Sequence, residues 1–285
     1  MSFGPKTITV FLDDSASGRR RVAHAAALAQ RWGAHLVGVN VVFAGVALPA
    51  SMSFARGGPA FKQVATYRRQ LDSDAEDSAI EVDAHFRAVC TQLGVSGKLH
   101  QIGRVNTTEE AIHCAFHSDL VIVGHPEPHG LPDELSVEKL LLASGAPILI
   151  VPNAWEGETI GNKVLIGWNA SREARRAVAD AMAFLVTAKS VTVLSIHPDE
   201  EHEPDEAEVS DIAEWLRRHG AHVDLAQLPS KGFLIPAVLL GFADESASDL
   251  LVIGAYSQSR LKERLLGGTT RTLLAHTLMP TLMSR

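Results

Sequence analysis

The sequence lacks the features that mark an exported, membrane or nucleic-acid-binding protein. Its 285 residues include two cysteines, Cys90 and Cys114, with no C-x-x-C spacing, which indicates neither a disulfide framework nor a zinc motif. No run of about 18 apolar residues is present, and the N-terminus lacks the order of a signal peptide. A formal net charge of −7 disfavours general nucleic-acid binding. We therefore expect a soluble, cytoplasmic protein that binds neither membrane nor nucleic acid.

Catalytic and metal-binding motifs are also lacking. There is no Ser-His-Asp order, nucleophile elbow or paired-carboxylate spacing, and no G-x-x-x-x-G-K-[ST] of a P-loop ATPase. His113, Cys114 and His117 have helical spacing, and His125 and His129 form a second pair, but neither group has clear further ligands for zinc. We therefore expect no catalytic residue and no protein-held metal, and we favour a function other than catalysis.

What the sequence does contain is a regular alternation of short apolar segments and longer segments with helical periodicity. In the first half, strands are predicted at 7–13, 34–43, 98–102, 119–124 and 147–151, and helices at 17–32, 61–93, 107–116 and 135–143. The pattern then repeats, with strands predicted at 163–168, 190–197, 221–228, 249–254 and 281–283, and helices at 171–187, 206–219, 233–244 and after Thr270. This alternation predicts an α/β fold with parallel sheets.

The repeat is also visible in the letters of the sequence. SASGRRRVA at 15–23 aligns with SREARRAVA at 171–179, and DLVIVG at 119–124 aligns with DLLVIG at 249–254. We therefore predict two tandem, doubly wound domains at 1–152 and 163–285, joined by a linker at 153–162. The first copy is longer between its two matches, and we place the extra residues in the loop after Val46 and in the long helix that follows.

A possible phosphate site follows the strand at 249–254. The strand stops at Gly254, and a polar loop with Arg260, Lys262 and Arg264 leads to GGTT at 267–270, where an apolar helical pattern begins. Free backbone N–H groups and the positive end of a helix both favour an anion. The order of strand, polar loop and glycine-opened helix therefore predicts a phosphate cradle.

On these residues the whole chain resembles a tandem member of the universal stress protein family. The resemblance is carried by the start of the first strand, the DLLVIG strand, a G-x-x-G-x9-G-[ST] loop pattern and the terminal P-x-L-M-S strand. It implies five-stranded parallel sheets with the order 3-2-1-4-5 and flanking helices. It also implies ATP or a related adenine nucleotide as ligand in some members, and mostly regulatory roles in stress survival.

Independent of the resemblance, a sheet with this order reverses its winding between strands 1 and 4, and ligands bind at the carboxyl ends of the strands beside such a reversal. In the second copy, Asn169 offers a donor and an acceptor to a base or ribose, and Gly254 allows close approach of the backbone to the sugar. The predicted nucleotide-binding residues are Asn169, Ala170, Ile253, Gly254, Ser257, Gly267, Gly268, Thr269 and Thr270. The only metal expected is Mg²⁺ accompanying the nucleotide.

The sequence departs from the family pattern at two places in this loop. Ser257 replaces the second glycine, and Gly268 replaces the Ser or Thr after the third. An alternative therefore stays open, in which Gly267 and Gly268 only start a helix and nothing binds. In the first copy, three prolines and three acidic residues at 126–134 remove N–H donors and repel phosphate. Asp13 matches the acidic base- or ribose-contacting residue of the family, but we interpret the first domain as a non-binding partner.

Three functions follow from these alternatives. The first is a stress-response regulatory protein with an adenine nucleotide in its C-terminal domain, the second is a scaffold that acts through protein partners, and the third is a slow nucleotide hydrolase. The two final strands would each leave a sheet edge open, so we expect them to pair and to form an internal pseudo-dimer. A homodimer and an unidentified protein partner are further possibilities.

Overall fold

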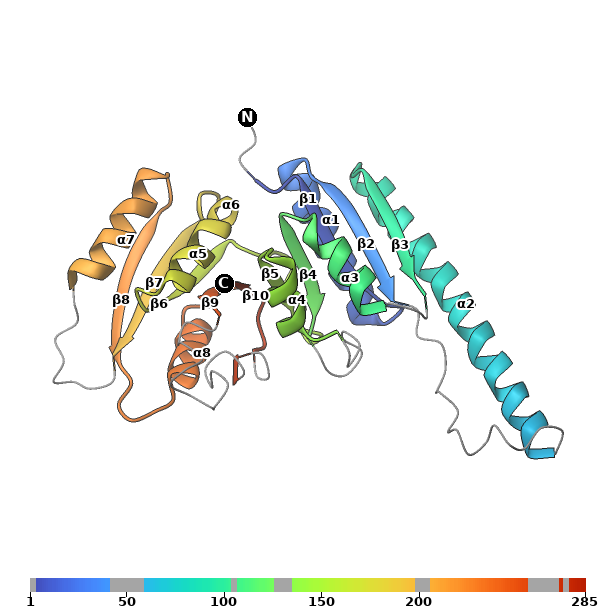
Figure 1. The fold of residues 1–285 in the computed structure, drawn as a ribbon. Helices are drawn as coiled ribbons and strands as arrows, with labels where there is room; N and C mark the ends of the chain where they lie inside the picture. The colour runs from blue at the N-terminus through green and yellow to red at the C-terminus, as the bar shows by residue number, and fades with distance from the viewer. Residues whose placement is uncertain are drawn as a thin grey trace.

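The computed structural model describes residues 4–41, 59–103, 107–125, 135–197, 206–255, 272–273 and 277–285. The first half contains β1 (Thr7–Leu12), α1 (Ala16–Trp32), β2 (His35–Val41), α2 (Pro59–Leu93), β3 (Gly97–Ile102), α3 (Thr107–Phe116), β4 (Leu120–Gly124), α4 (Val137–Ser144) and β5 (Ile148–Val151). The second half contains β6 (Lys163–Trp168), α5 (Arg172–Asp180), α6 (Met182–Leu185), β7 (Ser190–His197), α7 (Glu206–Arg218), β8 (Val223–Pro229), α8 (Ile235–Glu245), β9 (Leu250–Gly254) and β10 (Thr281–Ser284). The predicted α/β class is confirmed (Figure 1).

One predicted helix was wrong in its extent. The segment 171–187 was predicted as a single helix, but α5 and α6 are separate, with Ala181 between them. Phe184 N donates to Ala181 O at 2.8 Å, a tight turn of the i to i+3 type. All four residues of α6 are buried, so packing against the core interrupts a helix that periodicity alone would continue.

The described strands form a ten-stranded sheet with the order β3-β2-β1-β4-β5-β10-β9-β6-β7-β8. Each half therefore has the predicted order 3-2-1-4-5. Within each half, neighbouring strands are parallel, and the two halves meet where β5 pairs antiparallel with β10. Thr281 lies opposite Ile150, and Leu282 lies opposite Leu149. The predicted pairing of the two final strands is confirmed, whereas the division at 153–162 stays a prediction because the sheet is continuous through both halves.

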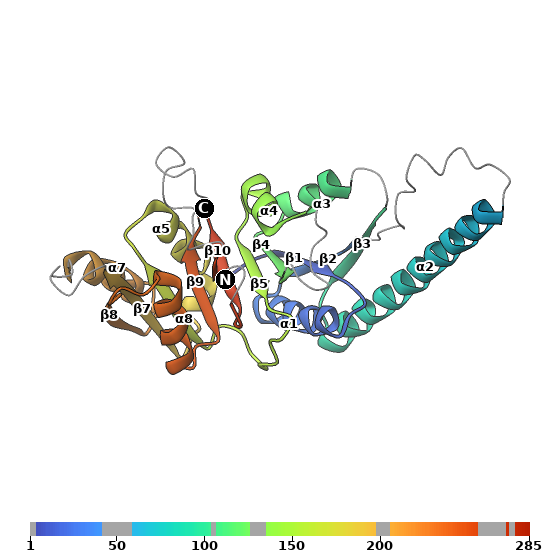
Figure 2. The same cartoon turned by 90° about the horizontal axis from the view of Figure 1, so that it is seen from below.

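Helices cover both faces of this sheet. Alternate strand residues belong to two cores, so that Leu120 and Ile122 of β4 pack with α1, and Val121 and Val123 pack with α3 and α4. Figure 2 shows α3 and α4 on the opposite side of β1 and β4 from α1. Burial on both faces explains why the strands are nearly continuous apolar runs. No helix in the described ranges is long and apolar enough to cross a membrane.

The aspartate that opens each DLVIVG or DLLVIG match fixes the start of the neighbouring strand. Asp119 Oδ2 accepts hydrogen bonds from the backbone N–H groups of Lys6 at 2.7 Å and Thr7 at 2.9 Å. Asp249 Oδ1 accepts from Lys163 N at 2.8 Å, and its carboxylate also accepts from the backbone at 161 and 162. The repeated aspartate therefore ties β4 to β1 and β9 to β6 in the same way.

The antiparallel junction predicts a measurable coupling between the halves. Leu149→Ala and Leu282→Ala should each destabilise the chain by about 2–4 kcal/mol, because each truncates a fully buried side chain. Since the two residues are direct register partners, the double variant should cost at least about 0.5 kcal/mol less than the sum. Urea unfolding followed by circular dichroism measures these free energies.

The control is Leu36, which is equally buried but lies on β2, away from the junction. Leu36→Ala combined with Leu282→Ala should be additive within about 0.5 kcal/mol. Additivity of the Leu149 and Leu282 variants would contradict a coupled junction.

A half-buried histidine on α1 predicts a pH dependence of stability. Burial and the charge of Arg20, one turn earlier, both lower the pKa of His24. The unfolded chain therefore takes up a proton near pH 6.5 that the folded chain resists, and stability should fall as the pH drops below about 6.5. His24→Gln should lose less unfolding free energy than the wild type between pH 8 and pH 5.5. Equal losses in urea titrations would count against this assignment.

Candidate functional site

The winding of the second half reverses between β6 and β9. β6 pairs with β7 on one side and with β9 on the other, and Gly167 lies opposite Ile253 near the carboxyl ends of the two strands. Asn169 follows β6 directly, and Gly254 ends β9. The structure therefore brings these two predicted residues to the same edge of the sheet, beside the reversal of strand order.

The turn from β6 into α5 is held by a short polar network. Asn169 Oδ1 accepts hydrogen bonds from Ser171 Oγ at 2.7 Å and Ser171 N at 3.3 Å, and Ser171 Oγ caps the helix by accepting from Ala174 N at 3.1 Å. Between them, Ala170 has φ of 51°, a left-handed conformation that costs a non-glycine residue about 1 kcal/mol. Asn169 and Ala170 are both exposed.

This network engages one of the two groups that Asn169 was predicted to offer to a ligand. The sequence predicted that its amide would offer a donor and an acceptor to a base or ribose, and that role stays a prediction. In the structure the carbonyl oxygen of that amide already receives two hydrogen bonds from Ser171. Any ligand at this edge would therefore meet an acceptor that is already engaged in fixing the turn.

Gly254 has a structural reason for its missing side chain. A Cβ at this position would lie 2.3 Å from Ala174 N and 2.4 Å from the carbonyl carbon of Glu173. The first turn of α5 therefore packs backbone to backbone on the end of β9. Sequence reasoning found the need for a close approach, but the neighbour that approaches in the structure is α5.

The other predicted residues of this site divide into two groups. The Ile253 side chain is 6% exposed and belongs to the core, so only its backbone could reach a ligand. Ser257, Gly267, Gly268, Thr269 and Thr270 lie outside the described residues, and their role stays a prediction.

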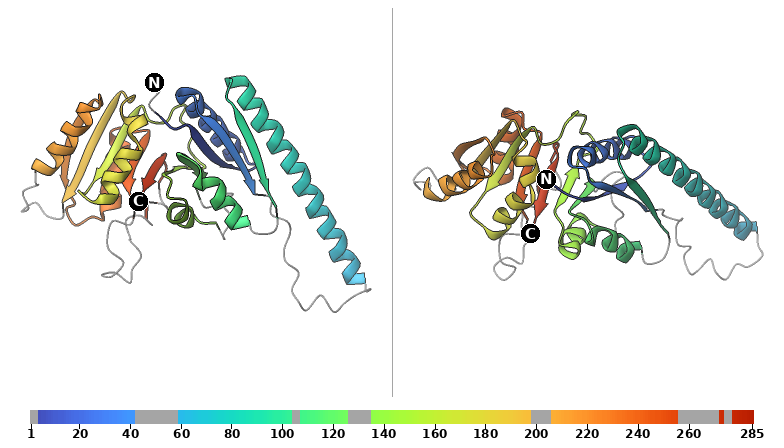
Figure 3. Two further views of the ribbon diagram at one scale, coloured as in Figure 1. Left: turned by 45° about the horizontal axis from the view of Figure 1, so that its top comes forward. Right: turned by 90° about the horizontal axis from the view of Figure 1, so that it is seen from above.

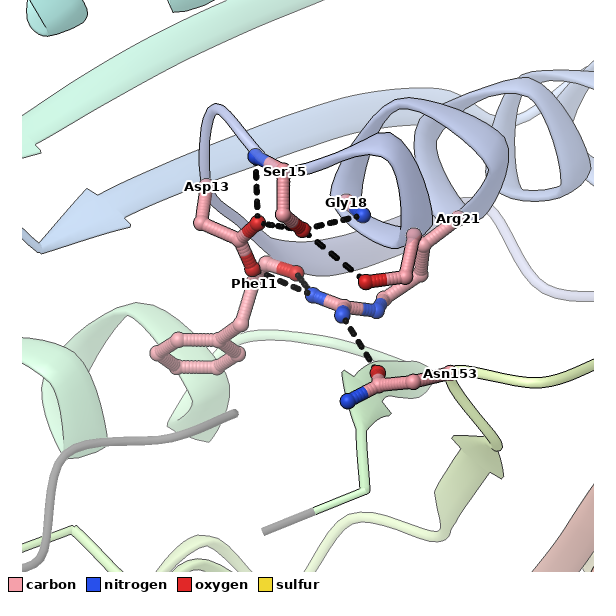
Figure 4. Close-up of polar contacts among 7 residues, drawn as sticks. Phe11, Asp13, Ser15, Gly18, Arg21 and Asn153 are labelled. Carbon is pink, nitrogen blue, oxygen red and sulfur yellow. Dashed lines mark hydrogen bonds and ion pairs between the residues drawn. The ribbon is translucent and has the colours of Figure 1, made fainter. Parts of the chain in front are cut away.

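The first half builds the same turn at the end of β1. Asp13 Oδ1 accepts hydrogen bonds from Ser15 N at 2.9 Å and from Ser15 Oγ, and Ser15 Oγ accepts from Gly18 N at 2.9 Å (Figure 4). Asp13 and Ser15 therefore correspond atom for atom to Asn169 and Ser171. The repeat seen in the sequence extends to the hydrogen bonds that start α1 and α5.

We call the space between the carboxyl ends of strands 1 and 4 of each half its strand-end crevice. The two crevices differ, because the Arg21 side chain fills the first one. Its side chain is 3% exposed, and Nη1 donates to Phe11 O at 2.7 Å and lies 3.4 Å from Asp13 Oδ2. Nη2 donates to Asn153 Oδ1 at 3.4 Å (Figure 4). A Cβ on Gly124, at the end of β4, would lie 2.2 Å from Nη2. The guanidinium therefore occupies the space between the ends of β1 and β4.

Arg21 is an unusual residue to bury. Burial lowers its pKa, and the nearby charge of Asp13 and their hydrogen bond oppose this shift. In the aligned repeats, the position of Arg21 is taken in the second half by Ala177, which is fully buried. Sequence reasoning missed this residue, although the alignment of SASGRRRVA with SREARRAVA places an arginine over an alanine there.

The histidine and cysteine candidates form no site in the described part of the chain. His113 and His117 contact each other edge to face, with ring centroids 5.1 Å apart. The described residues contain no group of three or more His, Cys, Asp or Glu that could hold a metal. Burial raises the pKa of both Cys90 and Cys114, and nearby Glu110 adds to this for Cys114, which lowers the reactivity of these thiols.

Solved structures match this architecture over nearly the whole chain. A universal stress protein from Archaeoglobus fulgidus covers 98% of this chain and 96% of its own, with 12% identity and a TM-score of 0.67. A candidate universal stress protein from Pseudomonas aeruginosa UCBPP-PA14 covers 98% and 93%, with 19% identity and a TM-score of 0.57. A functionally unknown protein from Pseudomonas aeruginosa PAO1 covers 98% and 92%, with 17% identity and a TM-score of 0.57. This chain has the universal stress protein fold.

The similarity is one of fold. No protein-family model matches the chain, and a search of curated proteins found no significant match. Shorter universal stress protein structures, one of them solved in complex with cAMP, each align with 45% of this chain.

The different surroundings of the two strand-end glycines predict different mutational behaviour. Gly254→Ala should destabilise this universal stress protein fold by about 2 kcal/mol, because the added methyl meets helix backbone that cannot rotate away. Gly124→Ala meets the end of a long side chain instead. Combining it with Arg21→Ala should therefore cost at least about 0.5 kcal/mol less than the sum of the single changes.

Gly254→Ala combined with Arg21→Ala is the matched control, since those residues lie in different halves and should act additively. Chemical denaturation of the single and double variants measures all of these values. If Gly124→Ala and Arg21→Ala were also additive, the guanidinium would not lie against Gly124.

Proposed function

We propose that this chain is a stress-response regulatory protein of the universal stress protein family that binds an adenine nucleotide, ATP or a relative, in its second half. The observation that carries the proposal is the difference between the two strand-end crevices. Arg21 and Asp13 fill the first crevice, whereas the second has the small Ala177 at the matching position and exposes Asn169 and Ala170 at its edge. At the first strand end a buried guanidinium lies between β1 and β4, whereas at the second the backbone of α5 lies on Gly254 and the turn residues Asn169 and Ala170 stay exposed.

Electrostatics supports the same choice of crevice. The first crevice carries the Asp13 carboxylate, and its nearby cation is already paired with that group. In the second, a neutral amide at Asn169 replaces the carboxylate, so no negative charge at that position would oppose a phosphate. Glu173, in the first turn of α5, lies 3.6 Å from the guanidinium of Arg172. The charge of this nearby carboxylate is therefore partly offset.

In this proposal the loop at 257–270 supplies the phosphate contacts. Ser257 and the backbone N–H groups of Gly267 and Gly268 would hold the phosphates, with the hydroxyl groups of Thr269 and Thr270, and Mg²⁺ would enter only with the nucleotide. The first half would act as a non-binding partner that completes the sheet through β5 and β10. A cytoplasmic location is part of the proposal, because both thiols remain unpaired in the structure.

Calorimetric titration of the full chain with ATP, ADP and AMP tests the proposal. Gly267→Val should abolish binding, because a branched side chain would block backbone approach to the phosphates. Thr270→Ala should weaken binding about fivefold, the equivalent of about 1 kcal/mol for one hydrogen bond. Asn169→Ala should also weaken binding, since it releases the turn before α5.

The control for Asn169→Ala is Asp13→Asn, which alters the matching residue of the first crevice and should leave nucleotide affinity unchanged. Circular dichroism checks that each variant is folded. A wild-type protein that binds none of the three nucleotides at millimolar concentration would overturn the proposal and favour the scaffold function. Release of ADP from ATP by the wild type but not by Gly267→Val would add slow hydrolysis to it.

A further inference from the structure

Helix α2 is far longer than its counterpart in the second half of the chain. It has 35 residues, whereas α7, which also connects strands 2 and 3 of its half, has 13. At about 1.5 Å per residue, α2 is roughly 52 Å long. Figures 1, 2 and 3 show it beside β3 at one end of the sheet, with its first half extending beyond the other elements.

Among the side chains of α2 that the structure describes, those packed on the domain lie in its second half. Val82, Phe86 and Cys90 are buried in the core next to α1 and β3. Ser78 Oγ donates to Asp14 Oδ2 at 2.7 Å, and Gln101 Nε2 donates to Ala79 O at 3.1 Å. These contacts anchor the helix from residue 78 onwards.

We call the preceding segment of α2, residues 59–77, the arm. Tyr67 is 62% exposed, and Asp74, Glu76 and Asp77 are exposed as well. Among the side chains described in the arm, the hydrogen bond found is within the helix, from Gln70 to Asp74 at 3.2 Å. A helical segment of this length is marginal in water without packing of an apolar face. The arm is therefore a helix that lacks a covering surface among the described residues.

The sequence of the arm continues the apolar register of the packed half. Phe61, Val64, Leu71 and Ala75 recur at spacings of three, seven and four, and a further seven residues lead to the buried Val82. This is the spacing of an apolar stripe that packs against another helix. The pattern favours a helical occupant over a flat surface.

The charges of the arm identify which helix would fit. Lys62, Arg68 and Arg69 lie in its first part, and the acidic residues Asp72, Asp74, Glu76 and Asp77 lie in its second part. Two arms side by side in parallel would place like charges together. In an antiparallel arrangement that sets position 68 of one arm opposite position 74 of the other, with Leu71 at the twofold axis, Arg68 and Arg69 of each arm lie beside the acidic part of the other. The arm is thus complementary to a second copy of itself, as an interface with twofold symmetry requires.

We propose that the arm of α2 pairs antiparallel with the arm of a second copy of this chain and makes it a homodimer. The edges of β5 and β10 are already paired with each other inside the chain, so a second copy needs another surface. The arm extends away from the domain, which lets two copies meet along it without contact between their sheets. This dimer does not depend on nucleotide binding.

Sedimentation equilibrium of the full chain tests the proposal. The wild type should be a dimer at micromolar concentration, and Arg68→Glu with Arg69→Glu should raise the dissociation constant about tenfold or more by making both contacts acidic. Asp74→Lys with Asp77→Lys should do the same by making both contacts basic. An equimolar mixture of the two double variants should form a heterodimer, because every contact is then between opposite charges.

Arg218→Glu is the control, since it reverses an exposed charge on α7, remote from the arm. It should leave the dimer unchanged, and circular dichroism should show that all variants keep the wild-type helix content. A monomeric wild type would overturn the proposal and would mean that another part of the chain or another molecule covers the arm. A dissociation constant that neither charge reversal changes would overturn it as well.

Discussion

The structure depends on the antiparallel pairing of β5 with β10. Each half of the chain ends its own sheet with a short, fully buried strand, whose backbone N–H and C=O groups would be unpaired on one side if the half stood alone. Pairing the two strands satisfies these groups and joins two five-stranded sheets into one of ten strands. Because β10 is the last strand of the chain, the sheet of the first half is completed by the other end of the sequence.

Contacts on one face of the sheet strengthen this junction. The Trp32 ring, at the end of α1, packs edge to face on Phe184 of α6 with centroids 4.8 Å apart. Arg31, the residue before it, donates to the side chain and the backbone carbonyl of Thr187. The short, buried α6 that interrupts the expected helix thus lies where the two halves meet. The departure from helical periodicity has a packing reason that belongs to the other half of the chain.

The turn that follows strand 1 is built in the same way in both halves, but the groups that lie beside it differ. In both halves a polar side chain after strand 1 accepts from a serine that caps the next helix. In the first, the buried guanidinium of Arg21 separates helix from strand end at Gly124, whereas in the second, the backbone of α5 lies directly on Gly254. A single change between arginine and alanine at the matching position accompanies this difference, and it is the physical basis for proposing that the second half is the one that binds a nucleotide.

The sequence by itself determined the strands, nearly all the helix positions and the pairing of the final strands, which follow from apolar periodicity, from an internal repeat and from the need to cover sheet edges. The 3-2-1-4-5 order was implied by the resemblance to the universal stress protein family and not by these local or pairwise rules. The neighbour of Gly254, the position of Arg21 beside Asp13 and Gly124, and the bridging role of Asp119 and Asp249 were decided only by the tertiary structure. Each of these depends on the distance between segments far apart in the chain. Such distances are set by the packing of the helices against the complete sheet.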